Sequence, residues 1–222
     1  MLRNLLLALL LLSSTARAAV VVLVHGFEPQ HEAPLWNKEI ARLEALEHEV
    51  HFLTWSKRLA LEQNTQQLAQ RFHELRKKHP EEFITVVAFS AGGIMALKAQ
   101  ELYQQEAADE RLHLHTVASP LYGYQAPRIA PLVALMIGKS ALAIGQGVFS
   151  AEEASEIRAC QHWINTDCRK DKHACASFDQ LPMTGNLPLD ELPCQAAPTT
   201  ALELGHEELV SHVLAELFPG QI

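Results

Sequence analysis

The sequence is poor in aromatic residues, which make up 6% of its 222 residues, and it has no cysteine before Cys160. Basic residues are also few, because 18 lysines and arginines stand against 26 acidic residues and the formal net charge is -8. An acidic surface argues against nucleic acid and anionic lipid as partners. The chain has no internal repeat and no low-complexity tract, and its length suits one domain with a substantial core.

The first eighteen residues form a short apolar segment. No apolar run after them predicts an integral membrane segment. Arg3 gives the N-terminal segment a positive start, residues 5–12 are mostly leucine, and Ala16-Arg17-Ala18 supplies a cleavage site. The pattern predicts a signal peptide over residues 1–18, cleaved after Ala18, and a periplasmic or secreted domain over residues 19–222. The alternative is an N-terminal membrane anchor. Loss of Arg3 and Arg17 would change the formal charge from -8 to -10.

The four cysteines all lie in the last third of the chain, at Cys160, Cys168, Cys175 and Cys194. An even number of cysteines in an exported chain favours one or two disulfides. Of the three full pairings, Cys168 with Cys175 and Cys160 with Cys194 is preferred, because the first bond closes a short loop. A zinc site is disfavoured, since no Cys-x-x-Cys spacing occurs.

Apolar strand patterns alternate with amphipathic helix patterns through the first half of the chain. Strands are predicted at residues 19–24, 49–55, 83–89 and 112–118, and helices at 35–47, between 61 and 79, and from 91 to about 103. This alternation predicts an α/β fold, with a mostly parallel sheet and helices on both faces. A fifth strand is predicted at 159–166, a loop with at most a short hairpin at 176–203, and a last helix at 206–217.

Residues 124–158 differ from this pattern, because residues 129–144 are almost wholly apolar apart from Lys139 and Ser140. Buried core helices are the simplest interpretation of this small apolar insertion. A mobile lid or cap over a pocket is the functional alternative.

Ser90 lies where an apolar strand pattern gives way directly to a helix pattern. Ala88 and Gly92, two residues before and after it, allow a sharp turn that would raise the hydroxyl at the edge of the sheet. A serine hydroxyl is a weak nucleophile, so it needs a base, a group that orients the base and donors for the oxyanion. Ser-x-Gly after an apolar run also occurs at ordinary strand–helix corners. Whether Ser90 is a nucleophile therefore depends on whether the sequence also offers a base, an acid and oxyanion donors.

The base and its acid are expected in loops at the carboxyl ends of late strands. His206 follows Gly205 and precedes an amphipathic helix, whereas His212 lies inside that helix, so His206 is favoured. Asp167 and Asp171 both follow the fifth strand. Asp171 is favoured because it leaves room for the loop to turn back toward His206, and Asp167 is the alternative. The remaining histidines, apart from His25, are interpreted as surface residues.

Two backbone N–H groups are expected to form the oxyanion hole. One is the amide of Ala91, directly after Ser90, and the other is that of Phe27 in His25-Gly26-Phe27, at the end of the first strand. Gly26 permits a close backbone approach. His25 is expected to brace this loop and to take no part in proton transfer.

Together these motifs resemble the α/β-hydrolase fold, and most closely its small bacterial lipase- and esterase-like members. The similarity covers most of residues 19–222, and the order Ser90, Asp171, His206 agrees with that family. Trp163, Asn165 and Asp171 also resemble an arrangement seen in some relatives. Ala88 departs from the family pattern, which usually has glycine there.

The resemblance implies hydrolysis of a small-molecule or lipid-like carboxylic ester through an acyl-enzyme, without cofactor or metal. A thioesterase, amidase or acyltransferase with the same triad is the alternative within enzymes, because the fold hosts all of them. The alternative that is not an enzyme is a catalytically silent binding protein of the same fold.

Overall fold

The computed structural model describes residues 18–27, 29–107, 111–119, 161–165, 199–202 and 206–220. Its elements, in chain order, are β1 (Val20–Val24), α2 (Pro29–Ala45), β2 (Glu49–Leu53), α3 (Leu61–Lys78), β3 (Ile84–Phe89), α4 (Ala91–Glu106), β4 (Leu112–Val117), β5 (Gln161–Asn165), β6 (Thr199–Leu202) and α9 (His206–Leu217).

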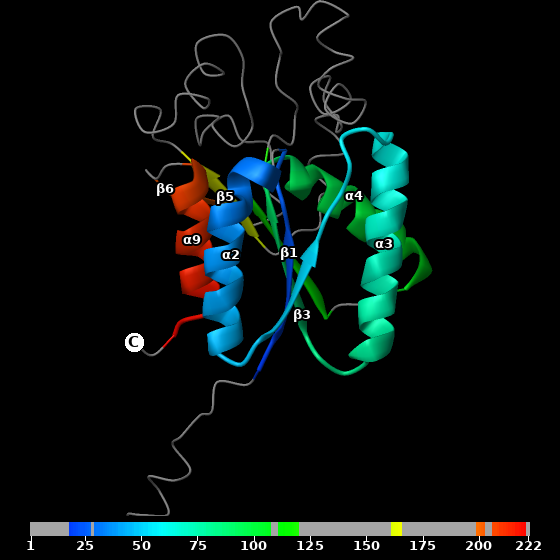
Figure 1. Cartoon of the computed structure of the whole chain (residues 1–222). Coiled ribbons are helices and arrows are strands. Elements are labelled where there is room, and N and C mark those ends of the chain that lie inside the picture. Colours follow the sequence, from blue (N-terminus) through cyan, green and yellow to red (C-terminus); the bar gives the residue numbers. More distant parts are fainter. Residues whose placement is uncertain are drawn as a thin grey trace, which may run out of the picture.

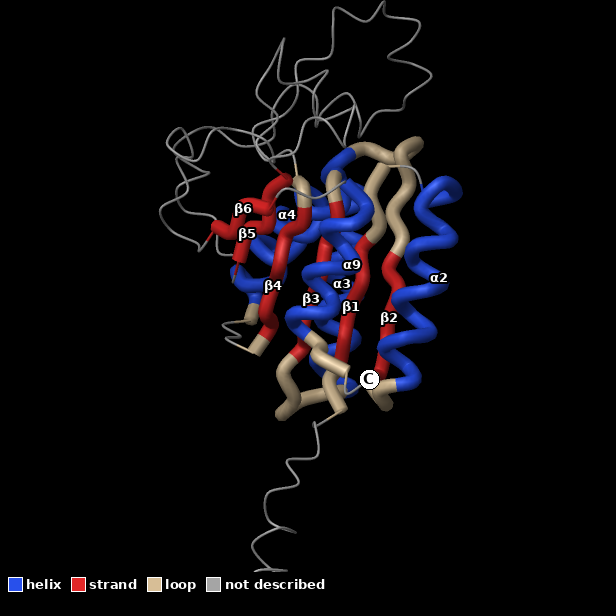
Figure 2. The backbone as a smooth tube through the Cα atoms, turned by 90° about the vertical axis from the view of Figure 1, so that its left-hand side faces the viewer, coloured by secondary structure: helices blue, strands red, loops and turns tan. Residues whose placement is uncertain are grey.

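The strands form one six-stranded sheet in the order β2-β1-β3-β4-β5-β6, and every neighbouring pair is parallel. Helices α2 and α9 cover one face, and α3 and α4 cover the other (Figure 1). The predicted α/β class with a parallel sheet and helices on both faces is therefore confirmed. All carboxyl ends of the strands lie at one edge of the sheet, at the top of Figures 1 and 2.

The strand order reverses between β1 and β3. From β1 the chain moves outward to β2, and then α3 carries it back so that β3 lies on the other side of β1. Ligands of open parallel sheets bind outside the carboxyl ends of the strands at such a switch point. Here the two strands at that point lead into Gly26 and Ser90.

Alternating side chains of the strands divide the core into two layers. In β1, Val20, Val22 and Val24 pack with α3 and α4, whereas Val21 and Leu23 pack with α2 and α9. All five residues of β1 are buried, which explains the continuous apolar run of this strand. The central strands are therefore fixed from both sides, and the loops at their ends start from rigid positions.

The structure corrects two element predictions. Helix α2 begins at Pro29, six residues before the expected start, because proline at the first helical position loses no intrahelical bond. Residues 199–202 form β6, parallel to β5, where a loop or short hairpin was expected. This four-residue strand is Thr-Thr-Ala-Leu, too short to show a period of its own, and only its pairing with β5 makes it a strand.

Several predictions fall outside the described residues: the apolar insertion at 124–158, the four cysteines with their pairing, both candidate acids and the signal peptide up to residue 17. No helix in the described part of the chain combines the length and hydropathy that crossing a membrane requires.

Candidate active site

Ser90 stands alone between β3 and α4 with a backbone conformation that is rare for a side-chain-bearing residue. Its φ is 50° and its ψ is -126°, outside the ordinary regions for an L-residue. The surrounding backbone fixes this strained geometry: the N–H of Ser90 donates to the carbonyl of Val117 at 2.7 Å, and the N–H of Gly93 donates to the carbonyl of Ser90 at 3.0 Å. The result is a half-buried serine raised at the carboxyl edge of the sheet.

Two glycines after Ser90 allow other parts of the chain to approach the corner. A Cβ on Gly92 would overlap the carbonyl oxygen of His25, and a Cβ on Gly93 would overlap the hydroxyl of Ser119. The predicted need for a small residue at Gly92 is confirmed. The need at Gly93 was not predicted, because Ser119 is a neighbour only in three dimensions.

His25 is buried at the end of β1 and uses both ring nitrogens for the loop. Its Nδ1 donates to the carbonyl of Gly26 at 2.6 Å, and its Nε2 accepts from the backbone N–H of Trp55 at 3.2 Å. The Trp55 indole stacks on the ring with centroids 5.4 Å apart and donates to the His25 carbonyl at 2.9 Å. Burial lowers the pKa of His25, in agreement with an Nε2 that accepts a hydrogen bond. These contacts agree with the expected bracing role.

Glu32 is a buried carboxylate that the sequence did not single out. Its Oε2 accepts from the backbone N–H of Gly26 at 2.7 Å and from the indole N–H of Trp36 at 3.0 Å. A Cβ on Gly26 would lie 2.6 Å from Glu32 Oε1 and 3.1 Å from Ser90 Cβ. The Gly26 peptide is therefore held between a fixed carboxylate and Ser90. Glu32 lies before the expected helix start at residue 35, so neither its helical spacing with Trp36 nor its contact with Gly26 was predicted.

The two expected oxyanion donors come after β1 and β3, which are neighbouring strands of the sheet. Ala91 is the first residue of α4, so its N–H has no acceptor within the helix. Phe27 follows Gly26, three residues after Val24, which pairs with Ala88 in the β1–β3 ladder. The Phe27 ring packs at the mouth of the corner, 6.3 Å from Trp55 between ring centroids.

His206 is the first residue of α9, at the edge of the sheet where Ser90 also lies. It follows β6 by four residues, and β6 is parallel to the strand that leads into Ser90. His212, in contrast, is a surface residue of α9 whose Nε2 lies 3.4 Å from a carboxylate oxygen of Glu216. Both histidines lie on α9, and the preference for His206 stays a prediction.

The interpretation of the other histidines as surface residues is wrong for His79 and His115, which are both buried. Burial lowers the pKa of His115 to about 4, with a smaller contribution from His113. Residues 112–115 alternate leucine and histidine, a pattern typical of one exposed strand face. Helices cover both faces of β4 instead, since α4 and α9 both contact this strand.

Comparison with known proteins identifies the fold. No family model and no curated protein sequence matches the chain. Among solved structures, the mature form of the lipase BlEst2 from Bacillus licheniformis matches with a TM-score of 0.62 and 16% identity, over 91% of this chain and 90% of that one. The esterase EaEST from Exiguobacterium antarcticum matches with a TM-score of 0.52 and 12% identity, over 90% and 92%. A bromoperoxidase from Bacillus anthracis matches with a TM-score of 0.52 and 11% identity, over 88% of each chain.

The chain has the α/β-hydrolase fold. In α/β-hydrolases, the nucleophile stands on a strained strand-to-helix corner at the top of the sheet, and the next backbone N–H contributes to the oxyanion hole. In this chain, Ser90 and Ala91 occupy the corresponding strand-to-helix corner. At 16% identity or less, the likeness concerns the fold alone, and the chemistry has to be argued from the site.

Proposed function

We propose that this α/β-hydrolase is an exported serine hydrolase that cleaves carboxylic esters through an acyl-enzyme. The observation that carries the proposal is the backbone of Ser90, with φ at 50° between β3 and α4. A strained conformation costs of order 1–3 kcal/mol and persists where the surroundings over-determine it, often at functional sites. Its position at the β1–β3 switch point adds support.

In the proposed reaction, Ser90 Oγ attacks the ester carbonyl carbon while His206 accepts the hydroxyl proton. The amides of Phe27 and Ala91 stabilise the oxyanion, and His206 returns the proton to the leaving alcohol. Water then attacks the acyl-enzyme by the same route and releases the acid. Asp171, with Asp167 as the alternative, would hold the imidazole in the required tautomer. Loss of one oxyanion donor is expected to cost about 3 kcal/mol of barrier.

The proposed substrates are small or lipid-like esters. The apolar residues 124–158 would shape the acyl pocket, either as packed helices or as a lid. The structural neighbours include a lipase and an esterase, which is consistent with this class.

Export is the second part of the proposal. It rests on the signal-peptide pattern of residues 1–18. The fold begins directly after the expected cleavage point, since the backbone N–H of Ala19 donates to His48 Nδ1 at 3.1 Å and β1 starts at Val20. N-terminal sequencing of the protein recovered from a bacterial periplasm should start at Ala19, and an intact N-terminus in the membrane fraction would favour the anchor instead.

A fluorophosphonate probe tests the nucleophile. Wild-type protein should be labelled, Ser90→Ala should not, and its ester hydrolysis should fall by at least about 10⁴-fold. Ser56→Ala is the matched control, because Ser56 also follows a strand of this sheet and should leave labelling unchanged. Folded wild-type protein that resists the probe would exclude the enzyme and favour the silent binding protein.

The acid is tested with Asp171→Asn and Asp167→Asn on nitrophenyl esters of graded chain length. The rate should collapse in Asp171→Asn, by about 10⁴-fold, and stay near wild type in Asp167→Asn. A collapse of the rate in Asp167→Asn alone would make Asp167 the acid in place of Asp171. The same panel with matched thioesters and anilides distinguishes an esterase from a thioesterase or an amidase.

A further inference from the structure

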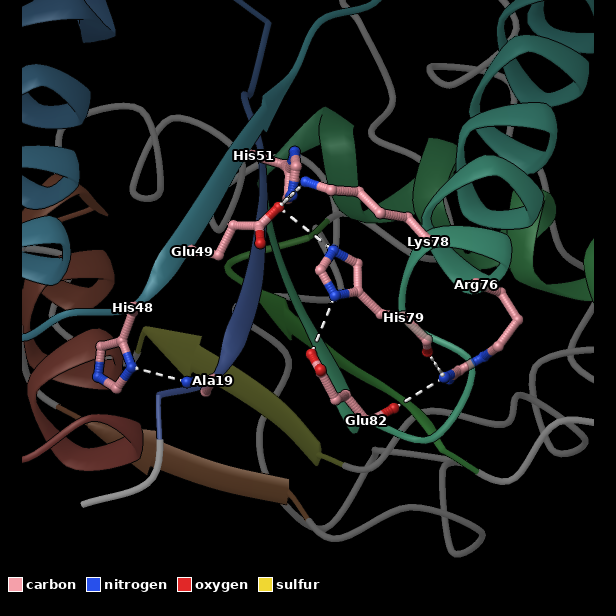
Figure 3. Close-up of polar contacts among 8 residues, drawn as sticks. All are labelled: Ala19, His48, Glu49, His51, Arg76, Lys78, His79 and Glu82. Atoms are coloured by element: carbon pink, nitrogen blue, oxygen red, sulfur yellow. Dashed lines mark hydrogen bonds and ion pairs between the residues drawn. The ribbon is translucent and has the colours of Figure 1, made fainter. Parts of the chain in front are cut away.

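A second polar cluster lies at the opposite edge of the sheet from Ser90. Glu49 and His51 are at the amino end of the edge strand β2, and His79 is the residue that caps α3 at its carboxyl end (Figure 3). Alternation along β2 places both Glu49 and His51 on the face covered by α3, where Leu53 also packs. The cluster therefore joins the edge strand to the α3–β3 turn.

The three side chains converge on one point. His51 Nε2 lies 2.7 Å from Glu49 Oε1, and His79 Nε2 lies 3.2 Å from the same oxygen. All three ligand atoms lie within 4.8 Å of one another. Within the described ranges, no other group of histidine, cysteine and carboxylate side chains meets this criterion.

We propose that Glu49, His51 and His79 form a binding site for a divalent transition-metal ion, with Zn²⁺ as the best fit. Two imidazole nitrogens and one carboxylate oxygen, with a fourth position left for water, are a common zinc ligand set. Ligands at roughly 2.0–2.1 Å from a tetrahedral zinc lie about 3.3 Å from one another. The 3.2 Å between His79 Nε2 and Glu49 Oε1 is close to that value, and the His51 contact needs to open only slightly.

The outer contacts of His79 are those that a metal ligand needs. Its Nδ1 lies 2.9 Å from Glu82 Oε2, so a carboxylate holds the ring with Nε2 toward Glu49. Arg76 fixes the turn itself, because its guanidinium donates to the carbonyl oxygens of His79 and Glu82, both at 2.7 Å. Only 8% of the His79 side chain is exposed, so this ligand is preorganised.

Lys78 is the competitor for this site. Its ammonium group contacts Glu49 Oε1, and the structure thereby pairs the carboxylate without a metal ion. The Lys78 side chain is 60% exposed, so it can move into solvent and release Glu49. His51 and Lys78 also line a groove of about 1010 Å³ between β2 and α3, which gives an ion a path to the cluster.

The test is Zn²⁺ binding by the tag-free protein, measured by calorimetry and by competition with a chromophoric chelator. Wild type should bind a zinc ion and unfold at a higher temperature in its presence. His51→Ala and His79→Ala should weaken this binding at least about tenfold, and Glu82→Gln by about tenfold. His73→Ala is the matched control, because His73 is a partly buried histidine of α3 that is paired with Glu106 and lies outside the cluster, so this variant should bind zinc as wild type does.

Lys78→Ala separates a metal site from an ion-pair cluster. Removal of the competing ammonium group should tighten zinc binding, whereas the neighbouring exposed Lys77→Ala should not change it. Absence of zinc binding by wild type, equal binding by wild type and His51→Ala, or no effect of Lys78→Ala would each overturn the proposal. His51 is only partly buried, so its variant remains informative even if His79→Ala fails to fold. Esterase activity is not a readout, and the outcome is therefore independent of the proposed function.

Discussion

Two buried side chains, His25 and Glu32, hold the loop beside Ser90 in place. His25 joins the end of β1 to the loop after β2, and Glu32 joins the same strand end to α2. Both groups are buried and hydrogen-bonded, as buried polar groups need to be. Neither is placed to react with a substrate, and we interpret both as positioning residues that keep the Phe27 amide beside Ser90.

Glu32→Ala should lower kcat on a nitrophenyl ester by about tenfold with little change in KM, because a hydrogen bond to a charged group contributes about 1.5–3 kcal/mol. The Gly26 peptide would lose its acceptor, and the loop would no longer be held against Ser90. Glu32→Gln keeps an acceptor at the same place and should retain more activity. If both variants lose only stability and keep kcat, Glu32 has no positioning role.

His115 should make the protein sensitive to acid. Its pKa in the folded protein is lowered to about 4, mainly by burial, while the unfolded chain titrates near the ordinary value of about 6.5. Between these values the unfolded chain takes up a proton that the folded protein refuses. This part of the stability is therefore complete above pH 6.5 and is lost as the pH falls toward 4, by up to about 3 kcal/mol.

Urea unfolding of His115→Gln from pH 7 to pH 4 checks this expectation. The variant should lose less free energy of unfolding on acidification than wild type does. His113→Gln, two residues earlier on the same strand, removes only the smaller contribution to the lowered pKa of His115 and should therefore flatten the pH profile only slightly. Parallel pH profiles for wild type and His115→Gln would contradict the assignment.

Among the elements, the β3–α4 corner depends most on the absence of side chains. Helix α4 starts directly at Ala91, and it approaches the end of β1 so closely that Gly92 touches the backbone of His25. The contact is with backbone, which cannot rotate away as a side chain can. The position of the helix relative to β1 therefore depends on Gly92.

Gly92→Ala should destabilise the protein by about 1–3 kcal/mol, the usual cost of overpacking, and should reduce fluorophosphonate labelling at Ser90. Gly220→Ala is the control, because a Cβ there meets only the flexible Leu46 side chain at 3.2 Å. Urea unfolding and labelling rates measure the two effects. Unchanged labelling in a folded Gly92→Ala protein would show that Ser90 does not depend on the close approach of α4 to β1.

At the scale of the whole molecule, the first and last described helices are joined through one buried carboxylate. Glu39 in α2 accepts from the Ser211 hydroxyl in α9 at 2.8 Å and pairs with Arg42 at 2.9 Å. Arg42 in turn donates to the carbonyl of Phe218 at 3.2 Å. These contacts span 172 and 176 residues of sequence, and they hold the helix that begins with His206 against the rest of the molecule.

Glu39→Ala should lower the free energy of unfolding by about 2 kcal/mol, because the partly buried Arg42 and Ser211 lose the buried carboxylate that both contact. Glu74→Ala, which removes an exposed carboxylate paired with Arg71, is the control and should change stability by less than about 1 kcal/mol. Urea unfolding measures both. An equal effect of the two substitutions would mean that the α2–α9 contact contributes little.

The fold class, the main strands and the corner at Ser90 could be predicted from the sequence, because hydrophobic period and small residues at fixed offsets are local signals. Only the tertiary structure revealed the strand β6, the burial of His79 and His115, and the meeting of Glu49 and His51 with His79. Sheet pairing and crossovers create these features, for example by bringing His79 to Glu49 across 30 residues of sequence, and no local pattern records such a contact.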